Sequence, residues 1–329
     1  MDKQIISNLK NAINNGMSPG CSLVVLKNGE EKINFFYGCF SDRDKTKITS
    51  STIFDLASIT KLYTTAVILR LQESGKININ DKVAKYLPVF LKSKLTVLDL
   101  LTHRANFELM LSKIRGEYQE RFGEEIFNIK PPAKASLEVH YENITFLFLG
   151  RIAEIICKKS LKKIFFDFLN EFELKDTNLG LKNQKSFISP PTEIKGKKVV
   201  QNLTHDESAR LMGGIAGNAG IFASAYDLAS FGNLWLDGKI VPKKNIEKVF
   251  TDYSETGHRS QGLGWHQDLY GYSTKNQKVY LHQGYTGCLL AVHLPSHTIC
   301  AFNCNRTYYG RDNIKHRKTM KQLIDFISL

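Results

Sequence analysis

The sequence has no long apolar run. Its first twenty residues, MDKQIISNLKNAINNGMSPG, contain no apolar stretch longer than two residues, such as Ile5 and Ile6. A signal peptide needs a much longer apolar core, and a membrane-spanning helix needs roughly 18 to 20 apolar residues in a row. No later segment reaches that length. These absences predict a cytoplasmic chain without a transmembrane segment.

Cysteine is present but never in closely spaced pairs. The six cysteines lie singly at Cys21, Cys39, Cys157, Cys288, Cys300 and Cys304. Because no C-x-x-C pair occurs, the sequence has no pattern for a zinc site or a dithiol redox centre. We expect reduced thiols, no metal and no cofactor.

Acidic residues are fewer than basic residues, and the formal net charge is +13. Basic clusters such as Lys158-Lys159 and Lys243-Lys244 are spread over the whole chain. Nothing resembles a nucleic-acid-binding module, and the glycine-rich segment 213–220 lacks the lysine of a phosphate-binding loop. We interpret the excess as a solvated surface and predict no nucleic-acid partner. An acidic polymer or an anionic membrane surface is the alternative partner.

Hydrophobic periodicity indicates a fold with strands at both ends of the sequence and helices in the middle. Helical patterns cover residues 3–15, 58–74, 97–101, 145–157, 161–172, 225–235 and 311–328. Strand patterns cover residues 21–26, 32–40, 263–266, 278–282, 288–294 and 298–303. We therefore predict an α/β fold with an antiparallel sheet built from both termini and flanked by helices. Residues 1–75 and 205–329 would form the sheet domain, residues 76–204 an inserted, mainly helical domain, and the active site would lie between them.

A serine and a lysine three positions apart are the first candidates for chemistry. Ser58 stands near the start of an apolar helix, and Lys61 shares its face of that helix. A serine hydroxyl must lose its proton to act as a nucleophile, and a buried lysine can serve as the base. In the alternative interpretation, Ser58 caps the helix and Lys61 extends its charged end into solvent.

Two further short motifs carry polar groups suited to a catalytic site. Tyr141 and Asn143 precede an apolar helix, and offer a phenol for proton transfer and an amide for binding. His282 and Gly284 end a strand pattern, where the glycine lets a substrate approach the backbone. Each motif alone also fits an ordinary helix start or strand end.

Together the three motifs resemble the serine β-lactamase and penicillin-binding-protein superfamily. The Y-x-N pattern is most similar to the class C β-lactamase branch. The H-x-G pattern is similar to the family VIII esterases and D-aminopeptidases of that branch. Further segments carry the resemblance, namely FDLA at 54–57, LLTH at 100–103, AGNAGIFAS at 216–224 and DLA at 227–229.

The resemblance implies a role for each residue of the motifs. Ser58 would be the acylated nucleophile, with Lys61 and Tyr141 sharing the role of base. Asn143 would bind the amide of the acyl group or orient Lys61. His282 would occupy the position of a lysine that helps to bind the substrate carboxylate in β-lactamases. The backbone N–H groups of Ser58 and Tyr285, the residue after Gly284, would form the oxyanion hole.

Two departures from the family pattern bear on the substrate. Histidine at position 282 carries less fixed positive charge than lysine, which favours small esters, amides or peptides over β-lactams. The family segment LLTHTSG here continues as Arg104, Ala105 and Asn106, and we expect His103 to be structural.

The sequence predicts a serine hydrolase acting on a small-molecule substrate. A β-lactamase, a D-alanyl peptidase and an acyltransferase of the same fold are alternatives. A non-catalytic, penicillin-binding-like sensor is an alternative of another class. The sequence does not indicate the oligomeric state.

Overall fold

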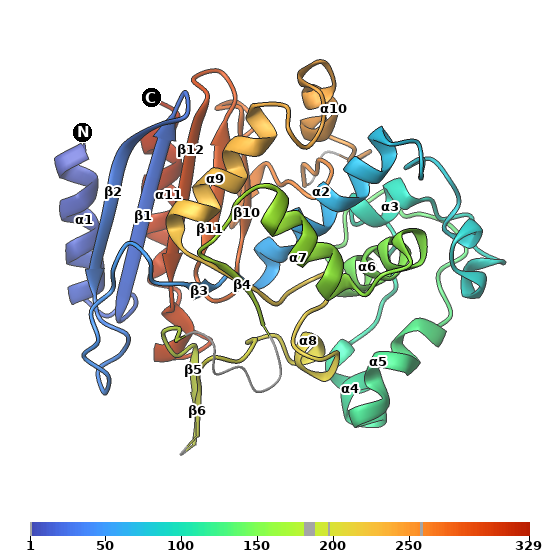
Figure 1. The fold of residues 1–329 in the computed structure, drawn as a ribbon, viewed down its shortest axis with the longest axis horizontal. Coiled ribbons are helices and arrows are strands. Elements are labelled where there is room, and N and C mark those ends of the chain that lie inside the picture. The colour runs from blue at the N-terminus through green and yellow to red at the C-terminus, as the bar shows by residue number, and fades with distance from the viewer. Residues whose placement is uncertain (1, 181–187, 197, 257–258) are drawn as a thin grey trace.

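The fold is organised around a five-stranded antiparallel sheet (Figure 1). The computed structural model describes residues 2–180, 188–196, 198–256 and 259–329. In the order across the sheet, the strands are β10 (Val279–Gln283), β11 (Leu289–His293), β12 (Thr298–Cys304), β1 (Gly20–Lys27) and β2 (Glu30–Gly38). The last strand pairs with the first, from Cys21 opposite Cys304 to Lys27 opposite Thr298. The sheet thus joins the two ends of the sequence, as predicted.

Two amphipathic helices cover one face of this sheet. Helix α1 (Asp2–Asn14) buries Ile5, Leu9 and Ile13, which lie four residues apart on one side of the helix. Helix α11 (His316–Ile327) packs beside α1, and its apolar side joins the same core. Both chain termini therefore lie on this side of the molecule (Figure 1).

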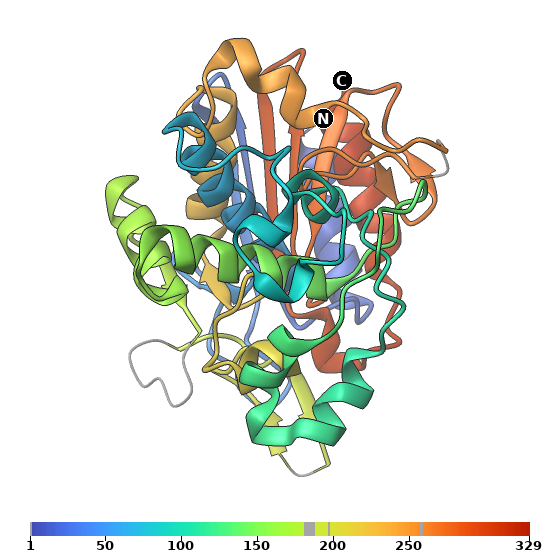
Figure 2. The same cartoon turned by 90° about the vertical axis from the view of Figure 1, so that its right-hand side faces the viewer.

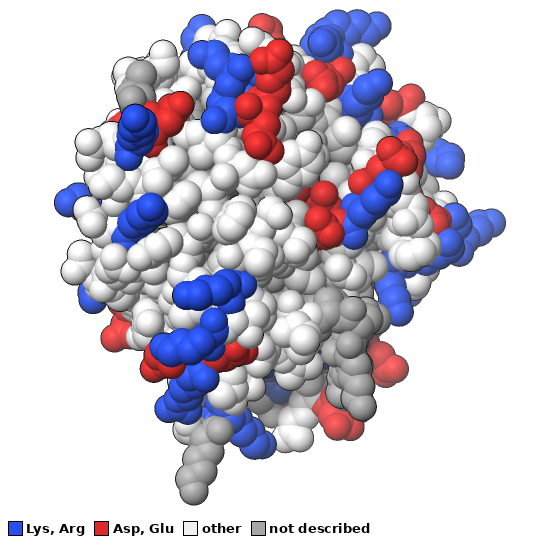
Figure 3. All heavy atoms as spheres, turned by 60° about the vertical axis from the view of Figure 1, so that its left-hand side comes forward, with Lys and Arg blue, Asp and Glu red and all other residues white. Residues whose placement is uncertain are grey.

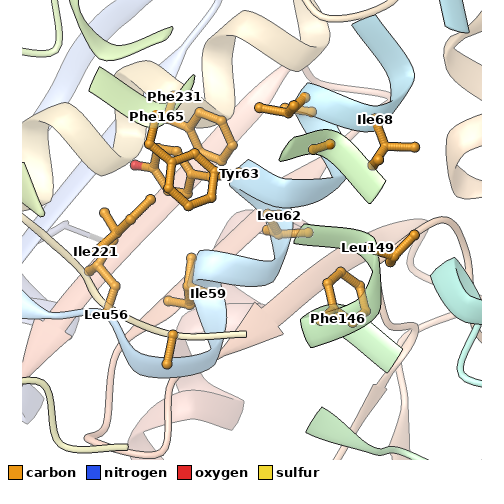
Figure 4. Close-up of a cluster of buried hydrophobic side chains, with 14 of the residues drawn as sticks. Leu56, Ile59, Leu62, Tyr63, Ile68, Phe146, Leu149, Phe165, Ile221 and Phe231 are labelled. Carbon is orange, nitrogen blue, oxygen red and sulfur yellow. The ribbon is translucent and has the colours of Figure 1, made fainter. Parts of the chain in front are cut away.

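The opposite face of the sheet contacts a larger core of helices. They are α2 (Thr60–Glu73), α6 (Asn143–Cys157), α7 (Leu161–Glu171) and α9 (Ala225–Leu236). The ring of Tyr63 in α2 stacks on Phe231 of α9 at a centroid distance of 3.7 Å (Figure 4). Helix α2 is buried almost all round because α6, α7 and α9 enclose it. A polar residue on α2 therefore needs partners inside the protein.

The remaining elements are short. The helices α3 (Val97–Leu101), α4 (Leu111–Tyr118) and α5 (Phe122–Glu125) lie with α6 beside the sheet (Figure 2). The other short helices are α8 (Glu207–Leu211) and α10 (Ile246–Phe250). Small sheets are formed by β3 (Phe54–Asp55), β7 (Ile221–Ala223) and β4 (Thr177–Leu179), by β5 (Glu193–Lys195) and β6 (Lys198–Val200), and by β8 (Asp268–Leu269) and β9 (Tyr272–Ser273). Among the described helices, none has the length and apolar character needed to cross a bilayer.

Three details differ from the sequence prediction. Ser58 lies in a 3-10 turn, η1 (Ala57–Ile59), and α2 begins only at Thr60. The pattern at 263–266 forms no strand, and His266 makes only isolated bridges, with Gln261 and with Leu281. The last helix begins at 316, not 311, because the turn η7 (Arg306–Tyr309) and a loop precede it. The proposed division into two domains stays a prediction.

The basic residues on one face of the molecule are dispersed. On the face shown in Figure 3, Lys and Arg side chains are scattered and many lie beside Asp or Glu side chains. This distribution agrees with the interpretation of the positive charge as a solvated surface.

Candidate active site

The turn that carries Ser58 is fixed by a buried carboxylate. Ala57 has a left-handed φ of 46°, and its N–H donates to Asp55 Oδ1 at 2.8 Å. The other oxygen, Asp55 Oδ2, accepts from the backbone N–H of His205 at 2.6 Å. Burial raises the pKa of Asp55 to about 6, against the effect of these two hydrogen bonds. Asp55 therefore connects the turn before Ser58 to a distant segment of the chain.

Lys61 is fully buried and bound to three oxygen atoms. Its Nζ donates to Ser58 Oγ at 2.9 Å and to Asn143 Oδ1 at 2.8 Å. A longer contact of 3.4 Å joins Nζ to the backbone carbonyl of Asn218. Among the residues that the structure describes, no carboxylate forms an ion pair with Lys61. The lysine thus links the serine of the first motif to the asparagine of the second.

Tyr141 stands over this lysine and is surrounded by imidazole rings. Lys61 Nζ lies 4.9 Å from the centre of the Tyr141 ring. The rings of His103, His266 and His282 lie 4.7, 5.5 and 6.1 Å from it, centroid to centroid. Burial lowers the pKa of all three histidines well below 6.5. These three rings are therefore neutral near pH 7, so that the histidines around Tyr141 add no charge to those of the nearby basic side chains.

Arg259 adds a permanent charge at the same end of the site. Its guanidinium carbon lies 5.4 Å from the centre of the Tyr141 ring. The positive charge of Arg259 also helps to lower the pKa of His282 and of His266. At this end of the site, the ring of His282 is therefore neutral, whereas Arg259 carries a positive charge.

The turn after β10 places Tyr285 beside the Ser58 segment. The N–H of Gly284 donates to the carbonyl of Cys288 at 2.8 Å. The hydroxyl of Thr286 donates to the backbone carbonyl of Asp55 at 2.6 Å. A Cβ at Gly284 would lie only 2.4 Å from the carbonyl oxygen of Leu56, so no larger residue fits. This close approach brings the backbone of Tyr285 towards that of Ser58.

These groups line one cavity of about 740 Å³. Ser58, Tyr141, His282, Gly284 and Tyr285 all contribute to its wall. Lys61 and Asn143 lie behind Ser58, where they contact it or each other. The volume is within the range of small-molecule sites. The structure thus brings the three sequence motifs to a single place.

Several residues of the site were not identified from the sequence. Asp55 and Asn218 belong to segments quoted only for the family resemblance, and His103 was expected to be structural. His266 and Arg259 carry no local motif. His103 Nδ1 accepts from the Glu142 N–H at 3.3 Å, which agrees with a supporting role beside Tyr141. Within the described part of the chain, no three or more His, Cys, Asp or Glu side chains are arranged so that they could hold a metal ion.

The fold and the sequence motif indicate the class of protein, and the match to a family model shows the family. A serine followed three residues later by a lysine is the S-x-x-K pattern of β-lactamases and penicillin-binding proteins. The Beta-lactamase family model matches residues 8–323. The chain belongs to the β-lactamase family and is a serine hydrolase.

Individual relatives are distant but cover nearly all of the chain. The Salmonella enteritidis PT4 protein named "Putative D-alanyl-D-alanine carboxypeptidase" is 26% identical, over 91% of this chain and 81% of its own length. The octameric penicillin-binding protein homologue from Pyrococcus abyssi has a TM-score of 0.75 at 21% identity, covering 99% of this chain and 78% of that chain. A β-lactamase/D-alanine carboxypeptidase from Pseudomonas syringae has a TM-score of 0.76 at 15% identity, covering 98% of both chains. The two solved structures share the fold.

Proposed function

We propose that this hydrolase forms its acyl-enzyme on Ser58 and acts on small ester, amide or peptide substrates. The observation that supports the proposal is the position of Lys61 Nζ, 2.9 Å from Ser58 Oγ and without a carboxylate partner among the described residues. A lysine that only stabilised the fold would be expected to form an ion pair or to reach solvent.

In the proposed mechanism, Ser58 Oγ attacks the substrate carbonyl while its proton passes to the pair formed by Lys61 and Tyr141. The backbone N–H groups of Ser58 and Tyr285 bind the oxyanion of the tetrahedral intermediate. Tyr141 returns the proton to the leaving group, and the acyl group stays on Ser58. Water then attacks the ester, and the same proton carriers act in reverse order. Asn143 orients Lys61 through its 2.8 Å hydrogen bond.

The preference for esters and peptides over β-lactams follows from His282. Burial makes this ring neutral, so the position does not offer the charge that a lysine would. A D-alanyl peptide is the favoured peptide substrate, and the name of the Salmonella relative supports it. An acyltransferase differs only in the nucleophile that reaches the acyl-enzyme. A β-lactamase and a non-catalytic sensor are the remaining alternatives.

We also propose a cytoplasmic location. All six cysteines are unpaired, and free thiols are typical of a reducing compartment.

The test is acylation of the serine with a panel of substrates. We would incubate the protein with p-nitrophenyl acetate, p-nitrophenyl butyrate, nitrocefin and D-alanyl p-nitroanilide, and record intact masses. Ser58→Ala should remove both turnover and the adduct, whereas the matched control Ser51→Ala, in an exposed loop, should retain them. Absence of any adduct on the wild type would refute the proposal. Turnover of nitrocefin alone would make the protein a β-lactamase.

A further inference from the structure

Asp55 is a buried residue that is bonded to both sides of the proposed oxyanion hole. It is 2% exposed and stands three positions before Ser58. Its carboxylate accepts from the backbone N–H groups of Ala57, at 2.8 Å, and of His205, at 2.6 Å. Its backbone carbonyl accepts from the hydroxyl of Thr286, at 2.6 Å. Three segments that are separate in the sequence therefore meet at this one residue.

The bond to Ala57 fixes the backbone just before Ser58. Ala57 has a φ of 46°, a left-handed conformation that is unfavourable for a residue with a Cβ. The hydrogen bond from its N–H to Asp55 Oδ1 stabilises this conformation. The N–H of Ser58 belongs to the next peptide unit, so its direction depends on the dihedral angles of Ala57.

The other two bonds fix the position of Tyr285. Thr286, which donates to the Asp55 carbonyl, is the next residue in the chain. The ring of His205, whose N–H donates to the Asp55 carboxylate, stacks on the Tyr285 ring at a centroid distance of 5.7 Å. The guanidinium carbon of Arg306 lies 4.9 Å from the centre of the same ring. Tyr285 is therefore held both through its neighbour in the chain and through its side chain.

Only an ionised carboxylate can accept at both side-chain positions of residue 55. Each of the two oxygens faces a backbone N–H. Asparagine, or an aspartic acid that has taken up a proton, would turn a second donor towards one of these N–H groups. Burial nevertheless raises the pKa of Asp55 to about 6, with Asp206 adding to the rise and Arg210 opposing it. The charge is thus lost as the pH falls through about 6.

We infer that Asp55 is a positioning residue for the proposed reaction, which holds the Ser58 and Tyr285 N–H groups at the separation needed to bind the oxyanion. The inference rests on the proposed function. Asp55 does not line the cavity, so it acts through the two turns and not on the substrate. Because the oxyanion develops only as the transition state forms, loss of the carboxylate should lower kcat and leave KM nearly unchanged.

The experiment compares two buried carboxyl groups. Asp55→Asn changes the one that holds the turns. Asp227→Asn is the matched control, because burial also raises the pKa of Asp227 to about 6, Thr177 donates to it at 2.9 Å, and it does not line the cavity. Hydrolysis of p-nitrophenyl butyrate would be measured at pH 7.5 and 5, at the isosbestic wavelength of p-nitrophenol. Thermal unfolding would verify at both pH values that each variant is folded.

Thr286 provides a second pair of variants that leaves the carboxylate in place. Thr286→Val keeps the shape of the side chain but removes the hydroxyl that donates to the Asp55 carbonyl, whereas Thr286→Ser keeps a hydroxyl. The valine variant should lower kcat on the order of tenfold, and the serine variant should stay near the wild type. This pair decides the question even if Asp55→Asn does not fold, since equal kcat values in the two variants would overturn the inference.

At pH 7.5, Asp55→Asn should lower kcat about 100-fold with little change in KM, and Asp227→Asn should keep the kcat of the wild type. The ratio of kcat between the wild type and Asp55→Asn should fall about tenfold from pH 7.5 to pH 5, because the wild type loses its own carboxylate near pH 6. An unchanged kcat in Asp55→Asn, an equal loss in both asparagine variants, or a ratio that is independent of pH would contradict the role of Asp55 alone. Absence of ester hydrolysis by the wild type would overturn the proposed function, and the inference with it.

Discussion

Acid should destabilise the protein through the three histidines around Tyr141. Burial lowers the pKa of His103, His266 and His282 well below 6.5 in the folded state, whereas each returns to about 6.5 on unfolding. The unfolded state therefore binds more protons, and stability is lost as the pH falls below 6.5. Between pH 7.5 and 5.5 each histidine costs about 1.4 kcal/mol, or about 4 kcal/mol for the three.

Two buried carboxyl groups act in the opposite direction. Burial raises the pKa of Asp55 and Asp227 to about 6, so the folded state takes up their protons first as the pH falls. Each offsets about 0.8 kcal/mol over the same interval. A loss of about 2 to 3 kcal/mol remains from these five groups, which is a large part of the stability of an ordinary domain.

Urea unfolding of His266→Gln isolates the contribution of one ring. The free energy of unfolding would be measured at pH 7.5 and 5.5 for the wild type, for this variant and for Asn11→Gln, an exposed control without an ionisable side chain. The variant should lose about 1.4 kcal/mol less than the wild type over this interval, and the control should match the wild type. An equal loss in all three proteins would refute the assignment of a neutral, buried His266.

Two further predictions concern Lys61 and the turn at Gly284. Lys61→Ala should slow acylation of the serine by about 10²- to 10⁴-fold, measured by intact mass, with an unchanged far-UV circular dichroism spectrum; wild-type acylation rates would make Lys61 structural. Gly284→Ala places a Cβ 2.4 Å from the carbonyl oxygen of Leu56 and should shift the oxyanion turn. It should lower kcat on the order of 100-fold, whereas Gly116→Ala, which meets no atom within 4 Å, should leave kcat unchanged; equal activities would contradict the proposed oxyanion hole.

Much of the fold could be predicted because its elements carry strong local patterns. The hairpin of β1 and β2 has a turn signal at Asn28 and Gly29, and α1 has apolar residues at helical spacing. The short strands β3, β4 and β7 were not predicted, since two or three residues cannot show an alternation. These strands form because they pair with one another in the folded protein, and not because of a local sequence pattern.

The residues of the candidate site also divide into those that could be predicted from the sequence and those that could not. Ser58, Lys61 and the two later motifs have fixed spacings within short segments, so they could be identified from the sequence. Arg259 lies in a loop, His266 lies at isolated bridges and Arg306 begins the short turn η7, and in none of these places does a periodicity indicate which way a side chain points. Their approach to Tyr141 and Tyr285 exists only in the folded chain.

The pairing of β1 with β12 has a consequence for how the protein folds. Cys21 lies opposite Cys304, so the central strand β1 obtains its second neighbour only from the end of the chain. During synthesis, the edge of β1 that will pair with β12 stays unpaired, and its free backbone groups can bind other strands. Such long-range pairing slows folding and lengthens the exposure to aggregation. The turn between β10 and β11, which carries Tyr285 of the proposed oxyanion hole, is also made late, so the newly made chain gains the complete proposed site only when its final strands dock.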